Sequence, residues 1–171
     1  HQGDRVLPFA ATEYEGRLKG LRTLMAEHGV EACVFTSMHN IAYYSGFLYC
    51  AFGRPYGLVV TETQSVTISA GIDAAQPWRR SHGDNITYTD WTRDNYWRAI
   101  HSVTGEHRVI GFEGDHLSLQ QSGKLENFLK PSRRVDLSHA TMTQRMHKSP
   151  AEIALIRAGA NTADIGGYAI R

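Results

Sequence analysis

The residues best suited to chemistry lie in the stretch 43–56, which reads YYSGFLYCAFGRPY and carries one charge, Arg54. Gly53 before it has unusual backbone freedom, and Pro55 after it favours an extended conformation at Arg54. A guanidinium is planar and permanently charged, so it can bind both oxygens of a carboxylate at once, with Phe52 as an apolar wall nearby. The segment predicts a site for a small carboxylate. A structural ion pair at a buried strand edge would use the same residues, and this alternative stays open.

Other chemistry-bearing patterns are weak in this sequence. It contains no GxSxG, P-loop or HExxH motif, and its nine His are spread singly, so we expect no metal site, cofactor or catalytic residue within it. Glu113 and Asp115, beside His116 in FEGDHLSL, could form a small acidic cluster, although a solvated loop is favoured. Cys33 and Cys50 lie in apolar, strand-like surroundings, which favours buried reduced thiols and a cytoplasmic location.

Composition excludes several partner classes. The 171 residues are 42% hydrophobic and 20% charged, an ordinary globular mixture for one domain. Lys and Arg number 18 against 17 Asp and Glu, and the basic residues form no stripe that would indicate nucleic-acid binding. No apolar run approaches the roughly 20 residues that span a bilayer, so no membrane partner is expected.

The tripeptide Trp78-Arg79-Arg80 has two interpretations that the sequence does not separate. Trp and Arg are enriched in subunit interfaces, so the three residues could pack across a subunit boundary. They could equally belong to a surface helix that is anchored by one Trp.

Hydrophobic periodicity predicts strands that alternate with helices. Helices are expected over residues 12–28, 40–44, 73–80, 93–103, 118–129 and 138–146, and strands over residues 31–36, 57–62, 65–70, 86–89, 108–112 and 135–137. Such alternation is typical of an α/β fold with helices on both faces of a sheet. Gly29 and Gly46 should end the first two helices, and Ser37, Ser118 (in a capping box with Gln121) and Ser138 should cap the helices that follow them. The spacing of the second and third strands indicates a hairpin, so the sheet should be mixed.

A further helix should begin at Ser149, because Ser149, Pro150 and Glu152 form a capping box with Pro at the first helical position. Its apolar stripe continues to the last residues without a glycine stop. We therefore expect an N-terminal piece of a longer protein, with one domain over residues 1–148 and a linker helix that starts over residues 149–171.

Three long segments resemble the N-terminal domain of the creatinases (creatine amidinohydrolases), within the creatinase/aminopeptidase P/prolidase family. They are TSMHNIAYYSGFLYCAFGRPYGLVV, ISAGIDAAQPWRRSHGDNITYTDWTRDNYWRAI and MHKSPAEIALIRAGANTADIGG, which begin at Thr36, Ile68 and Met146. The wider family shares only looser patterns, such as NI-x-Y-x-x-G-F and K-S-x-x-E-I.

The resemblance implies a specific role for this chain. Creatinases hydrolyse creatine to sarcosine and urea without a metal ion, and their general acid/base His lies in a C-terminal "pita-bread" domain. Their N-terminal domain reaches over the partner's active site in a homodimer, where an FGR loop contributes a Phe and an Arg to creatine binding. By motif, these residues are Phe52 and Arg54 here. Creatine or a similar guanidino carboxylate is the implied ligand, and the chain alone is expected to be inactive.

Two other functions remain open on the sequence. The same domain could belong to a metal-dependent Xaa-Pro peptidase, whose two Asp, one His and two Glu ligands would follow Arg171. It could also be a dimerisation module without catalysis, because a fold alone does not determine chemistry.

Overall fold

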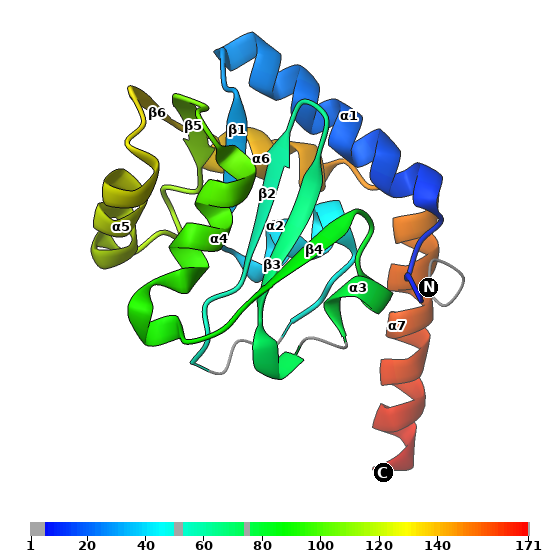
Figure 1. The fold of residues 1–171 in the computed structure, drawn as a ribbon. Coiled ribbons are helices and arrows are strands. Elements are labelled where there is room, and N and C mark those ends of the chain that lie inside the picture. Colours follow the sequence, from blue (N-terminus) through cyan, green and yellow to red (C-terminus); the bar gives the residue numbers. More distant parts are fainter. Residues whose placement is uncertain (1–5, 50–52, 74–75, 171) are drawn as a thin grey trace.

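The computed structural model describes residues 6–49, 53–73 and 76–170, with the side chain of Trp91 left out (Figure 1). The helices are α1 (Ala11–His28), α2 (Met38–Ser45), α3 (Pro77–Arg80), α4 (Asn95–Thr104), α5 (Leu119–Leu129), α6 (Ser138–Met146) and α7 (Pro150–Ala169). The strands are β1 (Ala32–Phe35), β2 (Gly57–Thr61), β3 (Ser65–Ala70), β4 (Asp84–Tyr88), β5 (Val109–Phe112) and β6 (Arg133–Asp136). These bounds lie close to those that the hydrophobic pattern predicts.

The six strands form one mixed sheet in the order β4-β3-β2-β1-β5-β6. Strand β2 runs antiparallel to β1 and to β3, as the expected hairpin requires, whereas β1/β5, β3/β4 and β5/β6 are parallel pairs. The expectation of a mixed sheet between two layers of helices is confirmed.

Strand β1 lies near the centre of the sheet and is buried on both faces, so its side chains alternate between two cores. Ala32 and Val34 belong to the core that α4 and α5 cover, whereas Cys33 and Phe35 belong to the core beneath α1 and α2. The two cores explain why the central strands are continuous apolar runs. Burial raises the pKa of the Cys33 thiol, which is buried and free as expected, whereas Cys50 lies outside the described residues.

Local signals set several helix ends as the sequence predicts. Gly29 ends α1 and Gly46 ends α2, each in the left-handed conformation that glycine adopts at low cost. Ser37 accepts a hydrogen bond from the Asn40 backbone N–H and so caps the start of α2. At α7, the Ser149 and Glu152 side chains form the complete capping box.

Two expected caps differ in the structure. Ser118 caps α5 through the Gln121 backbone N–H, but the Gln121 side chain instead accepts a hydrogen bond from Trp97 Nε1 at 3.0 Å. Ser138 is the first residue of α6 rather than its cap, and its backbone N–H donates to Asp136 Oδ1 at 2.9 Å. At α5, Trp97 from another helix competes for the Gln121 side chain. At α6, the nearby Asp136 carboxylate binds the Ser138 backbone N–H.

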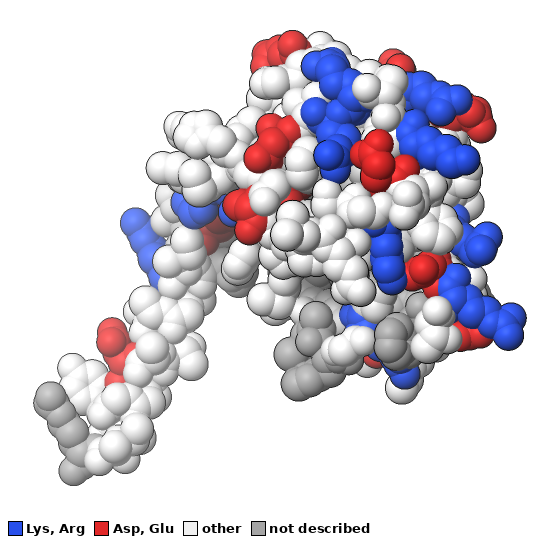
Figure 2. All heavy atoms as spheres, turned by 90° about the vertical axis from the view of Figure 1, so that its left-hand side faces the viewer, with Lys and Arg blue, Asp and Glu red and all other residues white. Residues whose placement is uncertain are grey.

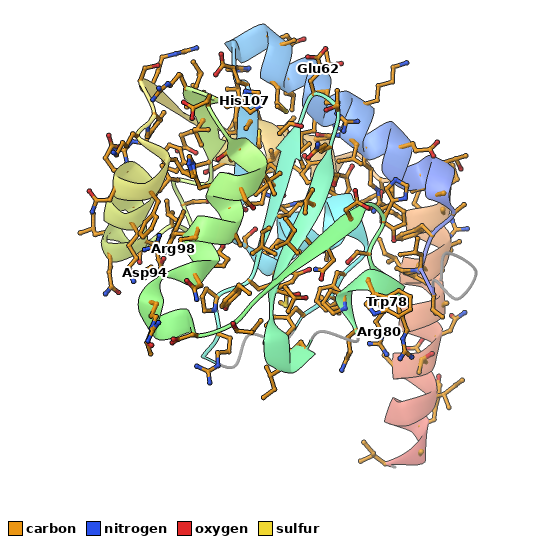
Figure 3. All side chains as sticks on the ribbon, in the orientation of Figure 1. Glu62, Trp78, Arg80, Asp94, Arg98 and His107 are labelled. Carbon is orange, nitrogen blue, oxygen red and sulfur yellow. The ribbon has the colours of Figure 1, made fainter. Side chains whose placement is uncertain are left out.

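Helices α4 and α5 lie side by side on one face of the sheet and are joined by polar contacts at their edges. Lys124 of α5 binds the Asp94 carboxylate at 2.5 Å, and the Arg98 guanidinium lies 5.7 Å from the ring centre of Phe128. Figure 3 shows Asp94 and Arg98 on the α5 side of α4. These contacts join α5 to α4.

Helix α7 projects away from the sheet, and few charged side chains lie along it (Figures 1 and 2). Its large apolar side chains are exposed, and they include Ile153, Leu155, Ile156, Ile165 and Tyr168. The expected apolar stripe is therefore uncovered in the described part of the chain.

Arg17 of α1 joins the first turn of α7 to the body of the domain. Its guanidinium donates to the Tyr43 carbonyl at 2.8 Å and binds Glu13 at 3.1 Å and Glu152 of α7 at 3.4 Å. The Phe9 and Tyr43 rings lie 4.5 and 4.4 Å from it. Only 5% of the Arg17 side chain is exposed, so this charge is buried among compensating partners.

Candidate functional site

A cavity of about 340 Å³ lies where β1 and β5 end and β2 begins. Its walls are mainly apolar, with polar groups from the segments that follow β1 and β5 and from the segment that precedes β2. The described lining consists of Thr36, Met38, Ile41, Phe47, Tyr49, Arg54, Pro55, Tyr56, Tyr96, His116, Leu117, Ser118 and Gln121. Size, apolar walls and few polar groups are typical of a small-molecule site.

The carboxyl-terminal side of the 43–56 segment is held by two tyrosine hydroxyls from distant elements. Tyr88 of β4 donates to the Pro55 carbonyl at 2.6 Å, and Tyr96 of α4 donates to the Tyr56 carbonyl at 3.1 Å. Since both acceptors directly follow Arg54, these bonds fix the backbone that carries the guanidinium.

The other side of the segment is held by aromatic packing and one more hydrogen bond. The Phe47, Tyr49 and Tyr56 rings lie against one another, with centroid separations of 5.0 to 6.0 Å. Tyr49 donates from its hydroxyl to Asp73 Oδ2 at 2.9 Å. These contacts pack Phe47 and Tyr49 against Tyr56, two residues after Arg54.

Of the two site residues predicted from the sequence, Arg54 lies in the cavity wall and is partly exposed. Gly53, just before it, has a φ of 68°, which agrees with the backbone freedom expected there. Phe52 lies outside the described residues. The described lining contains two basic side chains, those of Arg54 and His116, and it includes no Asp or Glu.

A buried carboxylate, Glu113, organises the polar side of the site. It is 2% exposed and accepts hydrogen bonds from the backbone N–H groups of Thr36 and Ser37 at 2.6 and 2.8 Å, and from Asn40 Nδ2 at 2.7 Å. The Ser37 hydroxyl also donates to it. Glu113 therefore places a negative charge at the start of α2, where the helix dipole favours an anion.

The sequence left open whether the residues around Glu113 form a cluster or a solvated loop, and the structure shows both environments. Glu113 is a buried structural acceptor, whereas His116 is exposed, with its Nδ1 2.9 Å from Thr36 Oγ1. His116 thus lies at the rim of the cavity.

Burial dominates the acid–base behaviour of the tyrosines around the cavity. It raises the pKa of Tyr56, Tyr88 and Tyr96 well above the ordinary tyrosine value. For Tyr88, the nearby Arg54 charge opposes part of this increase. The three hydroxyls therefore stay protonated in the folded protein, and those of Tyr88 and Tyr96 serve as hydrogen-bond donors.

Sequence reasoning missed the two tyrosines that hold the segment carrying Arg54. Tyr88 and Tyr96 lie within an expected strand and an expected helix, and their hydrogen bonds to this segment join positions 33 and 40 residues apart. Trp78, Arg79 and Arg80 belong to helix α3, and a role for them in a subunit interface stays a prediction. Arg79 lies 5.5 Å from the Trp78 ring centre, and Figure 3 shows Trp78 and Arg80 on α3.

Two further properties concern the described residues alone. No group of three His, Cys, Asp or Glu side chains in residues 6–49, 53–73 and 76–170 is arranged to hold a metal ion. Within the same ranges, no helix has both the length and the hydropathy needed to cross a membrane.

The fold and cavity define an α/β domain with a ligand-sized crevice at one end of a mixed sheet. A family model described as the creatinase/prolidase N-terminal domain matches residues 17–147. The chain therefore belongs to this family, as its resemblance implied.

Two curated relatives match nearly the whole chain. A creatinase from Bacillus sp. (strain B-0618) is 47% identical over 173 residues, which cover 98% of this chain and 42% of the relative. An uncharacterized hydrolase/peptidase, y4tL, from Sinorhizobium fredii is 25% identical, over 96% of this chain and 45% of the relative. The chain thus spans less than half the length of either relative.

Solved structures share the fold at low sequence identity. The Xaa-Pro dipeptidase from Bacillus anthracis matches with a TM-score of 0.76 and 17% identity, over 92% of this chain and 42% of that one. The N-terminal domain of an X-Pro dipeptidase from Streptococcus pyogenes matches with a TM-score of 0.67 and 21% identity, over 75% of this chain and 98% of that one. These likenesses establish the fold alone.

Proposed function

We propose that this chain is the N-terminal domain of a creatinase-like amidinohydrolase, which converts creatine and water to sarcosine and urea. In this proposal, residues 1–148 form the domain and residues 149–171 begin the linker to a catalytic domain. Arg54 binds the creatine carboxylate in the active site of the partner subunit of a homodimer, and Phe52 forms an apolar wall. The observation that carries the proposal is the position of Arg54 on a turn fixed by the Tyr88 and Tyr96 hydroxyls.

Two considerations support creatine as the substrate. The 47% identity to a creatinase extends over almost all of this chain, including the segment that carries Arg54. A carboxylate is also the group that a guanidinium binds best through two parallel hydrogen bonds. The remaining catalytic groups are expected in the domain that follows α7.

The first experiment measures the role of the carboxylate. In the enzyme that contains both domains, Arg54→Gln should raise KM for creatine by roughly 10- to 100-fold, the value of a charge-assisted hydrogen-bonded pair. The alcohol analogue of creatine, in which CH2OH replaces the carboxylate, should be affected little by this change. Arg93→Gln, at a side chain that is 80% exposed, is the matched control. An equal loss for creatine and its alcohol analogue contradicts the carboxylate role.

Subunit mixing tests whether Arg54 acts on the partner's active site. One subunit carries Arg54→Gln, and the other carries a substitution of the general acid/base His in the catalytic domain. If Arg54 acts in trans, the mixed dimer regains one complete site, because the intact catalytic domain receives the intact Arg54. If Arg54 acts within its own subunit, the mixed dimer keeps the raised KM of the Arg54→Gln enzyme.

A second candidate function is the N-terminal domain of an Xaa-Pro peptidase, since solved structures with this fold include several Xaa-Pro dipeptidases. This function predicts metal-dependent hydrolysis of Xaa-Pro dipeptides that a chelator abolishes. Creatine hydrolysis that persists in the presence of the chelator favours the amidinohydrolase instead.

A further inference from the structure

A second cavity, of about 560 Å³, lies where the end of α6 and the start of α7 meet α2 and the segment before α1. Its volume is in the range of small-molecule sites. Its described lining shares only Met38 with that of the cavity that Arg54 lines. The two cavities are therefore distinct, and a ligand in the second one need not contact Arg54.

The described lining of this second cavity carries more positive than negative charge. Arg17, Arg145 and Lys148 are its positively charged side chains, and Glu152 is its carboxylate. Glu152 is already engaged, because its Oε2 accepts a hydrogen bond from the Ser149 backbone N–H at 3.0 Å and its Oε1 lies 3.4 Å from Arg17 Nη2. Within the described residues, neither Arg145 nor Lys148 forms an ion pair with a carboxylate. Two positive charges are thus left to attract an anion.

A buried polar chain holds the Arg145 guanidinium in place. Its Nη1 donates to Asn40 Oδ1 at 2.5 Å, and Asn40 Nδ2 donates in turn to Glu113 Oε1 at 2.7 Å. The Lys148 ammonium donates to the Arg145 backbone carbonyl, which keeps the two charges close together. A guanidinium has five N–H donors, so the bond to Asn40 leaves others for a ligand. A charge that is already positioned loses little entropy when it binds an anion.

The rest of the wall favours an apolar ligand body. Met38, Leu48 and Leu155 line the cavity, and their side chains are 44%, 70% and 53% exposed. The Phe9 and Tyr43 side chains border the same cavity. Exposed apolar side chains that gather around one cavity are typical of a binding site, since a ligand there removes their surface from water.

We propose that this second cavity binds a small phosphate monoester with an apolar or aromatic body. The phosphate lies on Arg145 and Lys148, and the body packs against Leu48 and Leu155. A phosphate monoester carries close to two negative charges above about pH 7, which matches the two cations, and its oxygens can accept hydrogen bonds from both side chains. The inference goes beyond the proposed function, because it concerns another cavity and requires neither a catalytic domain nor a partner subunit.

A histidine in the wall reports whether the cavity is occupied. His39 lines the cavity and is exposed, so a ligand there changes the environment of its ring protons. The His39→Gln variant identifies this resonance among those of the nine His. At about pH 8 an exposed His is neutral while a phosphate monoester is a dianion, so the shift reports binding rather than titration.

The test titrates the 171-residue chain with benzyl phosphate at about pH 8 and follows the His39 ring protons by NMR. Benzyl alcohol supplies the same ring without the charge, and inorganic phosphate supplies the charge without the ring. We expect a saturable shift with benzyl phosphate, affinity for the alcohol that is weaker by about tenfold or more, and affinity for inorganic phosphate that is weaker by about threefold or more. No saturable shift with benzyl phosphate, or affinity for either control that equals its own, overturns the proposal.

Two variants assign the phosphate contact. Arg145→Gln should weaken the binding of benzyl phosphate by about tenfold or more, and Lys148→Gln, at an exposed side chain, by about threefold. Arg145→Lys should recover part of the affinity, because it keeps the charge. Arg93→Gln, at a side chain that is 80% exposed and outside the described lining, is the matched control and should leave the affinity unchanged. If Arg145→Gln does not fold, Lys148→Gln still tests the contact, and unchanged affinity in either folded variant overturns the proposal.

Discussion

Two regions of this domain each contain an arginine near aromatic residues, and the partners and exposure of the two side chains differ. Around Arg17, two carboxylates and a backbone carbonyl bind the guanidinium, and the side chain is 5% exposed. Around Arg54, tyrosine hydroxyls bind the neighbouring backbone carbonyls, while the side chain lines a cavity and is partly exposed.

The difference indicates a structural role for Arg17, whereas the recognition role of Arg54 belongs to the proposed function. A guanidinium surrounded by acids of its own chain contributes to the position of the elements it joins. A guanidinium on a fixed turn beside a cavity is preorganised for a ligand, because little entropy remains to be lost on binding. Since the residue type is the same, the surroundings decide its role, and four measurements can test this contrast.

The largest expected effect is unfolding at alkaline pH, because both regions contain buried tyrosines. Burial raises the pKa of Tyr14, Tyr43, Tyr44, Tyr56, Tyr88 and Tyr96. The folded state keeps these protons above about pH 10, where the unfolded chain loses them. Their contribution to stability is complete below that pH and is lost as the pH rises. Tyrosinate absorbance and far-UV circular dichroism should therefore change in one common transition. Ionisation of most tyrosines before the dichroism changes contradicts this.

The next effect is Arg17→Met, which should lower the free energy of unfolding by about 3 kcal/mol, because it leaves Glu13 and Glu152 without their shared cation. Urea denaturation measures the change. Arg93→Met is the matched control, since Arg93 forms an ion pair with Asp90 but is 80% exposed, and it should change stability by at most about 0.5 kcal/mol. Equal losses in the two variants would show that burial of Arg17 has no energetic consequence.

Glu113→Gln should lower the free energy of unfolding by about 2 kcal/mol, since the new amide group faces buried N–H donors and leaves at least one of them unsatisfied. Glu126→Gln on the exposed surface of α5 serves as its control and should have little effect. A neutral result for Glu113→Gln in urea denaturation would mean that the start of α2 does not depend on this charge.

The smallest effect on stability is expected for Arg54→Gln in the 171-residue chain, within about 0.5 kcal/mol. A partly exposed side chain at a cavity wall contributes little to folding, whereas its loss should alter ligand binding. A stability loss comparable with that of Arg17→Met, measured in the same denaturation series, would assign both arginines a structural role.

Much of the fold follows from signals that are local in the sequence. Gly29 and Gly46 end their helices, the Ser149–Glu152 capping box starts α7, and the short turn between β2 and β3 makes the hairpin. Each signal acts over a few residues, so periodicity and turn chemistry suffice to locate it. The expected capping box at Ser118 is only half formed, because Trp97 from another helix binds the Gln121 side chain.

The site could be predicted only as far as its own segment reaches. The Gly53-Arg54-Pro55 sequence predicts a guanidinium on a turn, and Arg54 lines the cavity, while its role in ligand binding stays a prediction. The hydroxyls of Tyr88 and Tyr96 come from β4 and α4, and Glu113 binds Thr36 across 77 residues. These contacts depend on strand order, which hydrophobic patterning does not specify.

Helix α7 contacts Arg17 through its first turn, so a small change in its tilt there moves its other end by a much larger distance. Twenty residues at 1.5 Å per residue give it a length of about 30 Å, while the Arg17–Glu152 contact lies in its first turn. A tilt of about 10° at that end moves the other end by roughly 5 Å, from the same helical geometry. Small rearrangements around one buried guanidinium are thus magnified into large changes in where this helix points.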